Sequence, residues 1–469
     1  MKTRRRFISI LVAVGLILAI LVPTALAGPG AEDIKALFRQ DQVMAQEQAL
    51  VSFGPRVAGG PAEKAAADYI AAQMRSFGLD VTIQEFPMDY WEEKSTPVLQ
   101  QVAPNPTDYV SDVDFATMTY SGGGDATANL QAVDLLMPPT GGSTSGCEAA
   151  DFAGFTPGNI ALMQRGTCTF ALKAQNAEAA GAAGAIIFNE GNNPGRTGLL
   201  LGTLGGPGIC IPVVGTTFAL GEALYNLLLV GNVQVHLFVD AVGYPSTSQN
   251  VIGTLKGLQP DQGIVYIGGH YDSVSAGPGA NDDASGVAAM LEAARVLSTE
   301  GHRTKATLKF IAFGSEETGL NGSLYYVSTN LDDVSTKGIG MINLDMVGVG
   351  NELWIGNIGG GGDTLEDYAE GKATAMGMPW VPFTASCNSD HCYFEQVGVP
   401  AVFITQRPDP YYHTSQDTLD KIQPATLEAN GELATATMYD WAKNPVLRAK
   451  KAAKLAEVAV YHDQILALK

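Results

Sequence analysis

Short, continuous runs of apolar residues recur through the second half of the chain, a pattern typical of strands that are buried on both faces of a sheet. These runs cover residues 264–267, 307–313, 339–344 and 399–405. Segments with helical periodicity separate or follow them, one starting near Ser285 and another expected over residues 426–442. Because strands alternate with helices, this half predicts an α/β domain with a mostly parallel central sheet.

The first part of the chain extends this domain. Helices are expected over residues 31–50 and 62–77, and residues 81–86 have the pattern of a strand. Turn-rich segments then interrupt the pattern until the strand–helix alternation returns. We therefore predict one discontinuous domain, which comprises residues 28–114 and 243–445.

A smaller unit is expected between these two parts, over residues 115–242. It contains a β-α-β pattern, with strands at 159–163 and 185–188 and a helix over 170–183. No cluster of histidines, cysteines and carboxylates lies in this unit, so no chemistry is assigned to it.

The N-terminus has the features of an export signal. Lys2 and the arginines at 4–6 precede an apolar run over residues 7–22, and Ala25-Leu26-Ala27 has the form of a signal-peptidase site. Residues 1–27 are therefore predicted to be a signal peptide, with an uncleaved membrane anchor as the alternative. The arginines fit a twin-arginine signal as well as simple charge clustering.

The chain is strongly acidic, with a formal net charge of −20. This charge disfavours binding to nucleic acid or to anionic lipid and favours a secreted protein without membrane contact after signal removal. Retention in the periplasm or at the cell surface is the alternative location. The segment 446–469 is expected to form an added helix on the outside of the domain.

Five cysteines fit an oxidising compartment without making this a disulfide scaffold. Connectivity cannot be deduced from sequence. Our hypothesis pairs Cys147 with Cys168 and Cys387 with Cys392, which leaves Cys210 as the free thiol.

Five potential metal ligands follow strand-like runs in the second half: His270, Asp282, Glu317, Asp345 and His413. In open α/β sheets, sites assemble beyond the carboxyl ends of the strands, so these side chains are expected to converge. Two imidazoles and three carboxylates are too few for two separate tetrahedral zinc sites. They suffice if one carboxylate bridges two ions and water fills the remaining positions, which indicates a hydrolase with two adjacent metals.

Neighbouring residues suggest a division of roles around such a centre. Asp272 follows the first histidine by two positions in an extended segment, so it could accept the free imidazole N–H. Of Glu316 and Glu317, one can bind metal while the other takes a proton from water. Tyr412 could donate a hydrogen bond to an oxyanion, with the adjacent Tyr411 as the competing candidate.

Four blocks of sequence, in this order, resemble the secreted di-zinc aminopeptidases, a family that includes aminopeptidase Y and the bacterial leucyl aminopeptidases. The blocks are His270–Ser273, Gly277–Asp283, Ser315–Gly319 and Tyr412–His413. The resemblance extends over about residues 31–112 and 245–443. It implies a three-layer α/β/α peptidase domain. A smaller, β-rich protease-associated domain interrupts it, because the segments 163–170 and 177–183 resemble that kind of domain.

By position, the resemblance implies that His270 and Asp345 bind one zinc ion. It implies that Glu317 and His413 bind a second zinc ion and that Asp282 bridges the two.

Three further roles are implied by the same match. Glu316 corresponds to the general base, Asp272 to the partner of the ligand histidine, and Tyr412 to the oxyanion donor. A cis peptide bond is expected between Asp282 and Asp283.

The chain departs from some relatives at Asn388, where they have an arginine in the substrate site, so substrate preference is not carried over. His391 is expected to be structural or to lie outside the ligand set. The glycines at 359–362 lack the flanking strand and helix of a nucleotide site, and acidic pairs such as Asp332-Asp333 give no support for structural calcium.

The resemblance implies removal of N-terminal residues from peptides, and our hypothesis is that these residues are apolar and leucine-like. Alternatives on the same fold are glutaminyl-peptide cyclisation with a single zinc and carboxypeptidase activity, which needs a cationic pocket. A receptor-like protein without catalysis is the third alternative, although no ligand of the set is missing.

Overall fold

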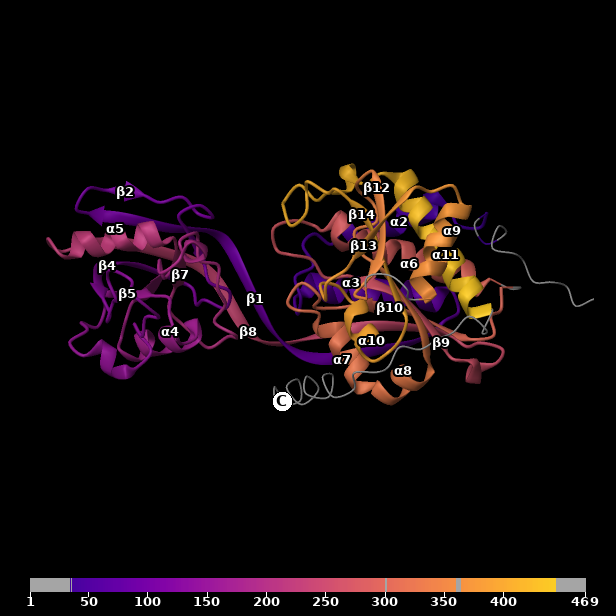
Figure 1. Ribbon diagram of the computed structural model, residues 1–469, viewed down its shortest axis with the longest axis horizontal. Helices are drawn as coiled ribbons and strands as arrows, with labels where there is room; N and C mark the ends of the chain where they lie inside the picture. Colours follow the sequence, from indigo (N-terminus) through magenta and orange to yellow (C-terminus); the bar gives the residue numbers. More distant parts are fainter. Residues whose placement is uncertain (1–33, 35, 300–301, 360–363, 444–469) are drawn as a thin grey trace, which may run out of the picture.

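The molecule has two lobes (Figure 1), and the computed structural model describes residues 34, 36–299, 302–359 and 364–443. The predicted signal peptide (1–27) and the predicted C-terminal helix (446–469) lie outside the described residues. Two long strands, β1 (Asp80–Ala103) and β8 (Gln234–Leu255), run from the large lobe into the small lobe. They pair antiparallel over both lobes, so the chain enters and leaves the small lobe along one two-stranded ribbon.

The large lobe is built around a mixed sheet in the order β13-β12-β14-β11-β9-β10-β8-β1. Its other strands are β9 (Ile264–His270), β10 (Thr307–Phe313), β11 (Gly338–Leu344), β12 (Glu352–Asn357), β13 (Trp380–Thr384) and β14 (Ala401–Arg407). The central strands β14, β11, β9 and β10 are parallel. On either side of them, β12 pairs antiparallel with β14, and β8 pairs antiparallel with β10. All four strands predicted from apolar runs are confirmed, and β12 and β13 are additional.

Helices cover both faces of this sheet, so the predicted three-layer α/β/α arrangement is confirmed. One face carries α2 (Gln40–Val51), α3 (Pro61–Ser76), α6 (Ser285–Ser298), α9 (Thr364–Ala375) and α11 (Pro424–Lys443). The other face carries α7 (Asn321–Thr329), α8 (Leu331–Lys337) and α10 (His391–Gln396). Side chains of β9 alternate between the two cores, with Val265 and Ile267 on one face and Tyr266 on the other.

The small lobe contains the predicted β-α-β unit. Its elements are β2 (Thr107–Asp108), β3 (Phe115–Thr117), β4 (Gly124–Ala132), β5 (Ile160–Gln164), α4 (Phe170–Ala179), β6 (Gly184–Phe188), β7 (Val213–Thr216) and α5 (Phe218–Leu228). β4, β5, β6 and β7 are parallel neighbours, and β4 pairs with β8. The junction predicted at 242–243 therefore falls inside the uninterrupted strand β8.

Short helical turns occur at Ala149–Phe152, Pro194–Arg196, Pro260–Gln262, Ala280–Ala284 and Leu419–Lys421. Disulfides join Cys147 to Cys168 and Cys387 to Cys392, and Cys210 is free and exposed, as predicted. Within the described ranges, every helix is too short or too polar to cross a bilayer.

Candidate metal centre

The predicted ligands come from the carboxyl-terminal ends of the parallel strands. His270 is the last residue of β9, Asp345 directly follows β11, and Glu317 lies in the turn after β10. His413 lies in the loop after β14, and Asp282 lies in the turn that precedes α6. Since parallel strands end at the same edge of a sheet, these five side chains meet there and line one cavity.

Asp282 lies between the two histidines. Its Oδ1 is 3.1 Å from Nε2 of His270, and its Oδ2 is 3.2 Å from Nε2 of His413. Glu317 Oε2 lies 3.0 Å from the same nitrogen of His413, and Asp345 Oδ1 lies 3.9 Å from Nε2 of His270. The carboxylate of Asp282 thus divides the cluster into a His270–Asp345 side and a His413–Glu317 side.

Carboxylates dominate the electrostatics of this cavity. Burial and the charge of Asp282 raise the pKa of Glu317 to about 7, and burial raises the pKa of Asp345 above its ordinary value. Burial lowers the pKa of His413, but its contacts with Asp282 and Glu317 outweigh burial and bring the pKa to about 10. Protons therefore bind readily to this cluster, and bound cations would replace them.

The donor set fits a metal. Ligand atoms of His270, Asp282 and Glu317 all lie within 4.8 Å of one another, as do those of His270, Asp283 and Asp345. Glu317 Oε1 is buried without a hydrogen-bond partner, so it has an unused lone pair next to this cluster. Imidazole nitrogens and carboxylate oxygens are ordinary zinc ligands.

Asp283 belongs to one of these groups, although the sequence did not mark it as a ligand. Its Oδ1 accepts hydrogen bonds from the backbone N–H groups of Gly286 (2.8 Å) and Met346 (3.0 Å). Asp283 therefore joins the start of α6 to the loop after β11. The peptide bond between Asp282 and Asp283 is cis, as predicted.

Asp272 lies next to His270 and is fully buried. Its Oδ1 lies 3.5 Å from Nδ1 of His270, on the side of the ring that faces away from Asp282. The same carboxylate accepts the backbone N–H groups of Glu316 (3.0 Å) and Glu317 (3.1 Å). The Asp272 carboxylate therefore holds the turn that carries two glutamates, whereas His270 Nδ1 lies closer to the Asp272 backbone carbonyl, at 3.2 Å. From the sequence we expected only the contact between the carboxylate and the imidazole.

Glu316 and Tyr412 line the same cavity. Glu316 Oε2 is 3.9 Å from His270 Nε2, and burial raises the pKa of this carboxyl well above its ordinary value. The Tyr412 ring stacks on His413 with centroids 3.8 Å apart, and partial burial with nearby acids raises the pKa of its phenol. Tyr411 instead packs against the hydrophobic core and does not line the cavity. Of the two candidate tyrosines, Tyr412 is therefore the one at the site.

Three supporting residues were missed by the sequence analysis. Asp417 accepts the backbone N–H groups of Asn281 and Asp282, and Ser389 Oγ donates to Asp345 Oδ2 at 2.7 Å. Arg56 is fully buried and donates to three backbone carbonyls of the segment between His270 and Asp282. Such residues are hard to recognise from the sequence, because a polar side chain is common and its partners here are remote in the chain.

His391 is not among the residues that line the cavity. It is fully buried and stacks on Phe403 with ring centroids 4.9 Å apart. Burial lowers its pKa to about 4, so the imidazole is neutral at physiological pH. These surroundings agree with the structural role expected for this residue.

Comparisons with known proteins agree with this geometry. Peptidase family M28 matches residues 250–438, and the PA domain matches residues 127–224. An aminopeptidase of Pseudomonas aeruginosa is 39% identical over 309 residues, which cover 65% of this chain and 56% of that protein. The chain thus spans little more than half the length of this curated relative.

Two further relatives are matched over most of their length. The aminopeptidase YwaD of Bacillus subtilis is 34% identical over 84% of this chain and 82% of that protein. The solved structure of BSAP, a zinc aminopeptidase from Bacillus subtilis, is 32% identical with a TM-score of 0.62, over 87% of this chain and 96% of that one. This chain therefore belongs to peptidase family M28 and contains a PA domain.

Proposed function

We propose that this protein is a secreted zinc aminopeptidase that removes N-terminal residues from peptides with two zinc ions. The position of the Asp282 carboxylate between two imidazoles carries this proposal, because each carboxylate oxygen faces a different histidine. His270 and Asp345 would hold one ion, Glu317 and His413 the other, and Asp282 both. The zinc aminopeptidase from Bacillus subtilis supports the choice of metal and reaction.

Bound zinc supplies positive charge for a carbonyl oxygen and lowers the pKa of water to about 7. Glu316 would take the proton of the attacking water and return it to the leaving amine, a role that suits a buried carboxyl whose pKa is raised. Tyr412 would donate its phenolic proton in a hydrogen bond to the oxygen that becomes negative. Asp272 would hold the imidazole of His270 and the turn of Glu316 in register.

The residues around the centre support a preference for apolar N-terminal residues. Met346 and Phe403 line the same cavity as the ligands and would contact the side chain of the first substrate residue. Secretion rests on the signal-like N-terminus and on the two disulfides.

Hydrolysis of leucine p-nitroanilide by the purified protein tests this proposal. We expect turnover that a chelator abolishes and that zinc restores, with two zinc ions per chain by elemental analysis. The same assay with an N-terminal glutamine peptide measures the competing cyclisation. Absence of leucine p-nitroanilide hydrolysis by protein that contains zinc would refute the proposed activity, and one zinc per active chain would refute the two-ion centre.

A further inference from the structure

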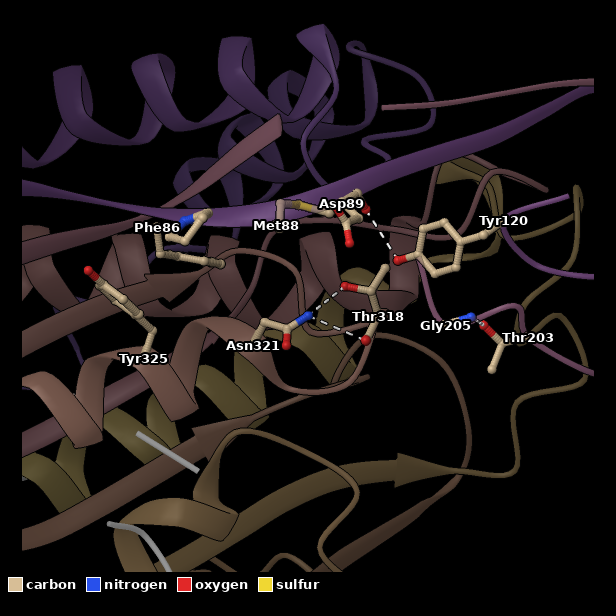
Figure 2. A pocket seen from close by; sticks show the side chains of 10 residues that line it. Phe86, Met88, Asp89, Tyr120, Thr203, Gly205, Thr318, Asn321 and Tyr325 are labelled. Atoms are coloured by element: carbon tan, nitrogen blue, oxygen red, sulfur yellow. Dashed lines mark hydrogen bonds between the residues drawn. The ribbon is translucent and has the colours of Figure 1, made fainter. Parts of the chain in front are cut away.

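A second cavity, of about 290 Å³, lies where the two lobes meet (Figure 2). One wall is the ribbon strand β1 at residues 86–89. A second wall comes from small-lobe loops through Tyr120 and Thr203, and a third from the large lobe through Thr318 and Tyr325. We call this cavity the interlobe crevice.

The crevice combines aromatic walls with one acidic side chain. The rings of Phe86 and Tyr325 stack with centroids 5.3 Å apart, and Tyr120 lies opposite them (Figure 2). Asp89 is the acidic residue of the lining, and none of the lining residues is basic. Aromatic faces and a carboxylate are the two groups that bind a lysine or arginine side chain.

Among the described residues, the Asp89 carboxylate has no partner of opposite charge. No lysine, arginine or histidine of the described ranges forms a salt bridge with it, and the Tyr120 hydroxyl donates to the backbone carbonyl of Asp89 rather than to its side chain. Partial burial raises the pKa of this carboxyl above its ordinary value. The small lobe also approaches the Asp89 carboxylate. A Cβ atom at Gly206 would lie 3.1 Å from Asp89 Oδ2.

The crevice and the metal centre share one turn of the chain. Glu317 lines the metal cavity, and the next residue, Thr318, lines the crevice. The turn is tight, because the Glu316 carbonyl accepts the N–H groups of both Gly319 and Leu320 at 2.8 Å. Since consecutive Cα atoms lie about 3.8 Å apart, the walls of the two cavities meet at this turn.

We propose that the interlobe crevice binds a basic side chain of the substrate, within the first few residues after the scissile bond. This inference rests on the proposed aminopeptidase function and deepens it. With the N-terminal residue at the metal centre, the rest of the peptide would follow the turn past Thr318 into the crevice. There a lysine or arginine side chain would lie between Tyr325 and Tyr120 and pair with Asp89.

The test uses amidated peptides Leu-Ala-Ala-Ala-Ala in which lysine, glutamine or glutamate replaces each of residues 2 to 5 in turn. For the wild-type protein we expect kcat/KM to favour lysine over glutamine by roughly two- to five-fold at one position, the effect of one partly exposed ion pair. Asp89→Asn should abolish this preference, and Asp89→Lys should reverse it in favour of glutamate. Leucine p-nitroanilide has no residue that reaches the crevice, so its hydrolysis should be unchanged in both variants.

A matched control separates the crevice from the general negative charge of the protein. Asp261→Asn removes one exposed carboxylate of the large lobe outside the crevice, and the lysine preference should persist in it. Equal rates for lysine and glutamine at all positions, or a preference that survives Asp89→Asn, would overturn this inference while leaving the aminopeptidase function intact. Failure of the wild-type protein to hydrolyse leucine p-nitroanilide would instead refute the proposed function itself.

Discussion

The two lobes have similar local topology but use it for different purposes. Both contain parallel strands joined by helices, and both place polar residues where these strands end. In the small lobe, Gln164 at the end of β5 donates to the Glu190 carbonyl and accepts the Leu136 N–H, and Asn189 after β6 is likewise bonded to backbone. In the large lobe, the corresponding side chains face one another instead, as Asp282 does with His270.

This difference shows what separates a structural strand end from a chemical one. A polar side chain that is hydrogen-bonded to backbone groups stabilises the fold and has less capacity for a ligand. Carboxylates gathered around imidazoles leave unbalanced charge that a cation can neutralise. The fold alone therefore does not determine which lobe reacts.

The largest expected difference between the lobes appears when one acid that follows a strand is neutralised in each lobe. Glu316→Gln should lower kcat for leucine p-nitroanilide by about 10²- to 10⁴-fold, because the variant lacks the group that accepts the proton of water. Zinc content should be unchanged. Glu190→Gln is the matched change in the small lobe and should retain wild-type turnover. Equal kcat values for the Glu316 variant and the wild type would contradict the assigned base.

A smaller effect is expected from the buried cation of the large lobe. Arg56 donates to the carbonyls of Tyr271, Pro278 and Gly279, so Arg56→Met leaves these groups without partners. We expect the free energy of unfolding to fall by about 3 kcal/mol, together with a loss of bound zinc. Chemical denaturation and elemental analysis measure the two quantities. Arg56→Lys keeps the charge and should lie between the variant and the wild type, and an unaltered denaturation midpoint in Arg56→Met would exclude this supporting role.

The smallest effect is expected from the buried cation of the small lobe. Lys173 donates to the Ser145 carbonyl, and burial lowers its pKa from 10.5 to about 8. Between these values the unfolded chain binds more protons than the folded one, so the stability that Lys173 contributes rises with pH. The melting temperature of the wild type relative to Lys173→Met should therefore increase from pH 8 to pH 10.5, on the order of 2–4 °C.

Below pH 8 the lysine is protonated in both states, so this difference should be constant. Lys256 is exposed in the large lobe, and Lys256→Met provides the control in which no such pH-dependent difference is expected. If the difference in melting temperature decreases as the pH rises from 8 to 10.5, the lowered pKa assigned to Lys173 is contradicted.

Continuous apolar runs made the central strands predictable, and β10 was predicted with its observed bounds. β13 escaped because it contains Pro382 and its side chains are largely exposed. The ribbon escaped because β1 is buried on one face only beyond residue 86 and passes through the exposed segment 94–96. A strand without a buried face on both sides has no strong apolar signal.

The predicted ligands were found together because residue type and strand ends both mark them. Arg56 and Asp417 carry no such mark. Their partners lie 215 and 136 residues away, respectively, so only the folded chain shows that they hold the segments around His270 and Asp282. The interlobe crevice likewise depends on how two lobes meet, which no local pattern records.

The ribbon has a consequence for protein engineering. Tyr90 and Tyr244 are directly paired partners on β1 and β8, so the chain returns to within one strand spacing of the point where it departs. A tight hairpin turn placed there would excise the whole intervening segment while preserving every strand neighbour of the remaining sheet. We therefore expect that the PA domain can be excised at this point and that a different domain can be inserted in its place.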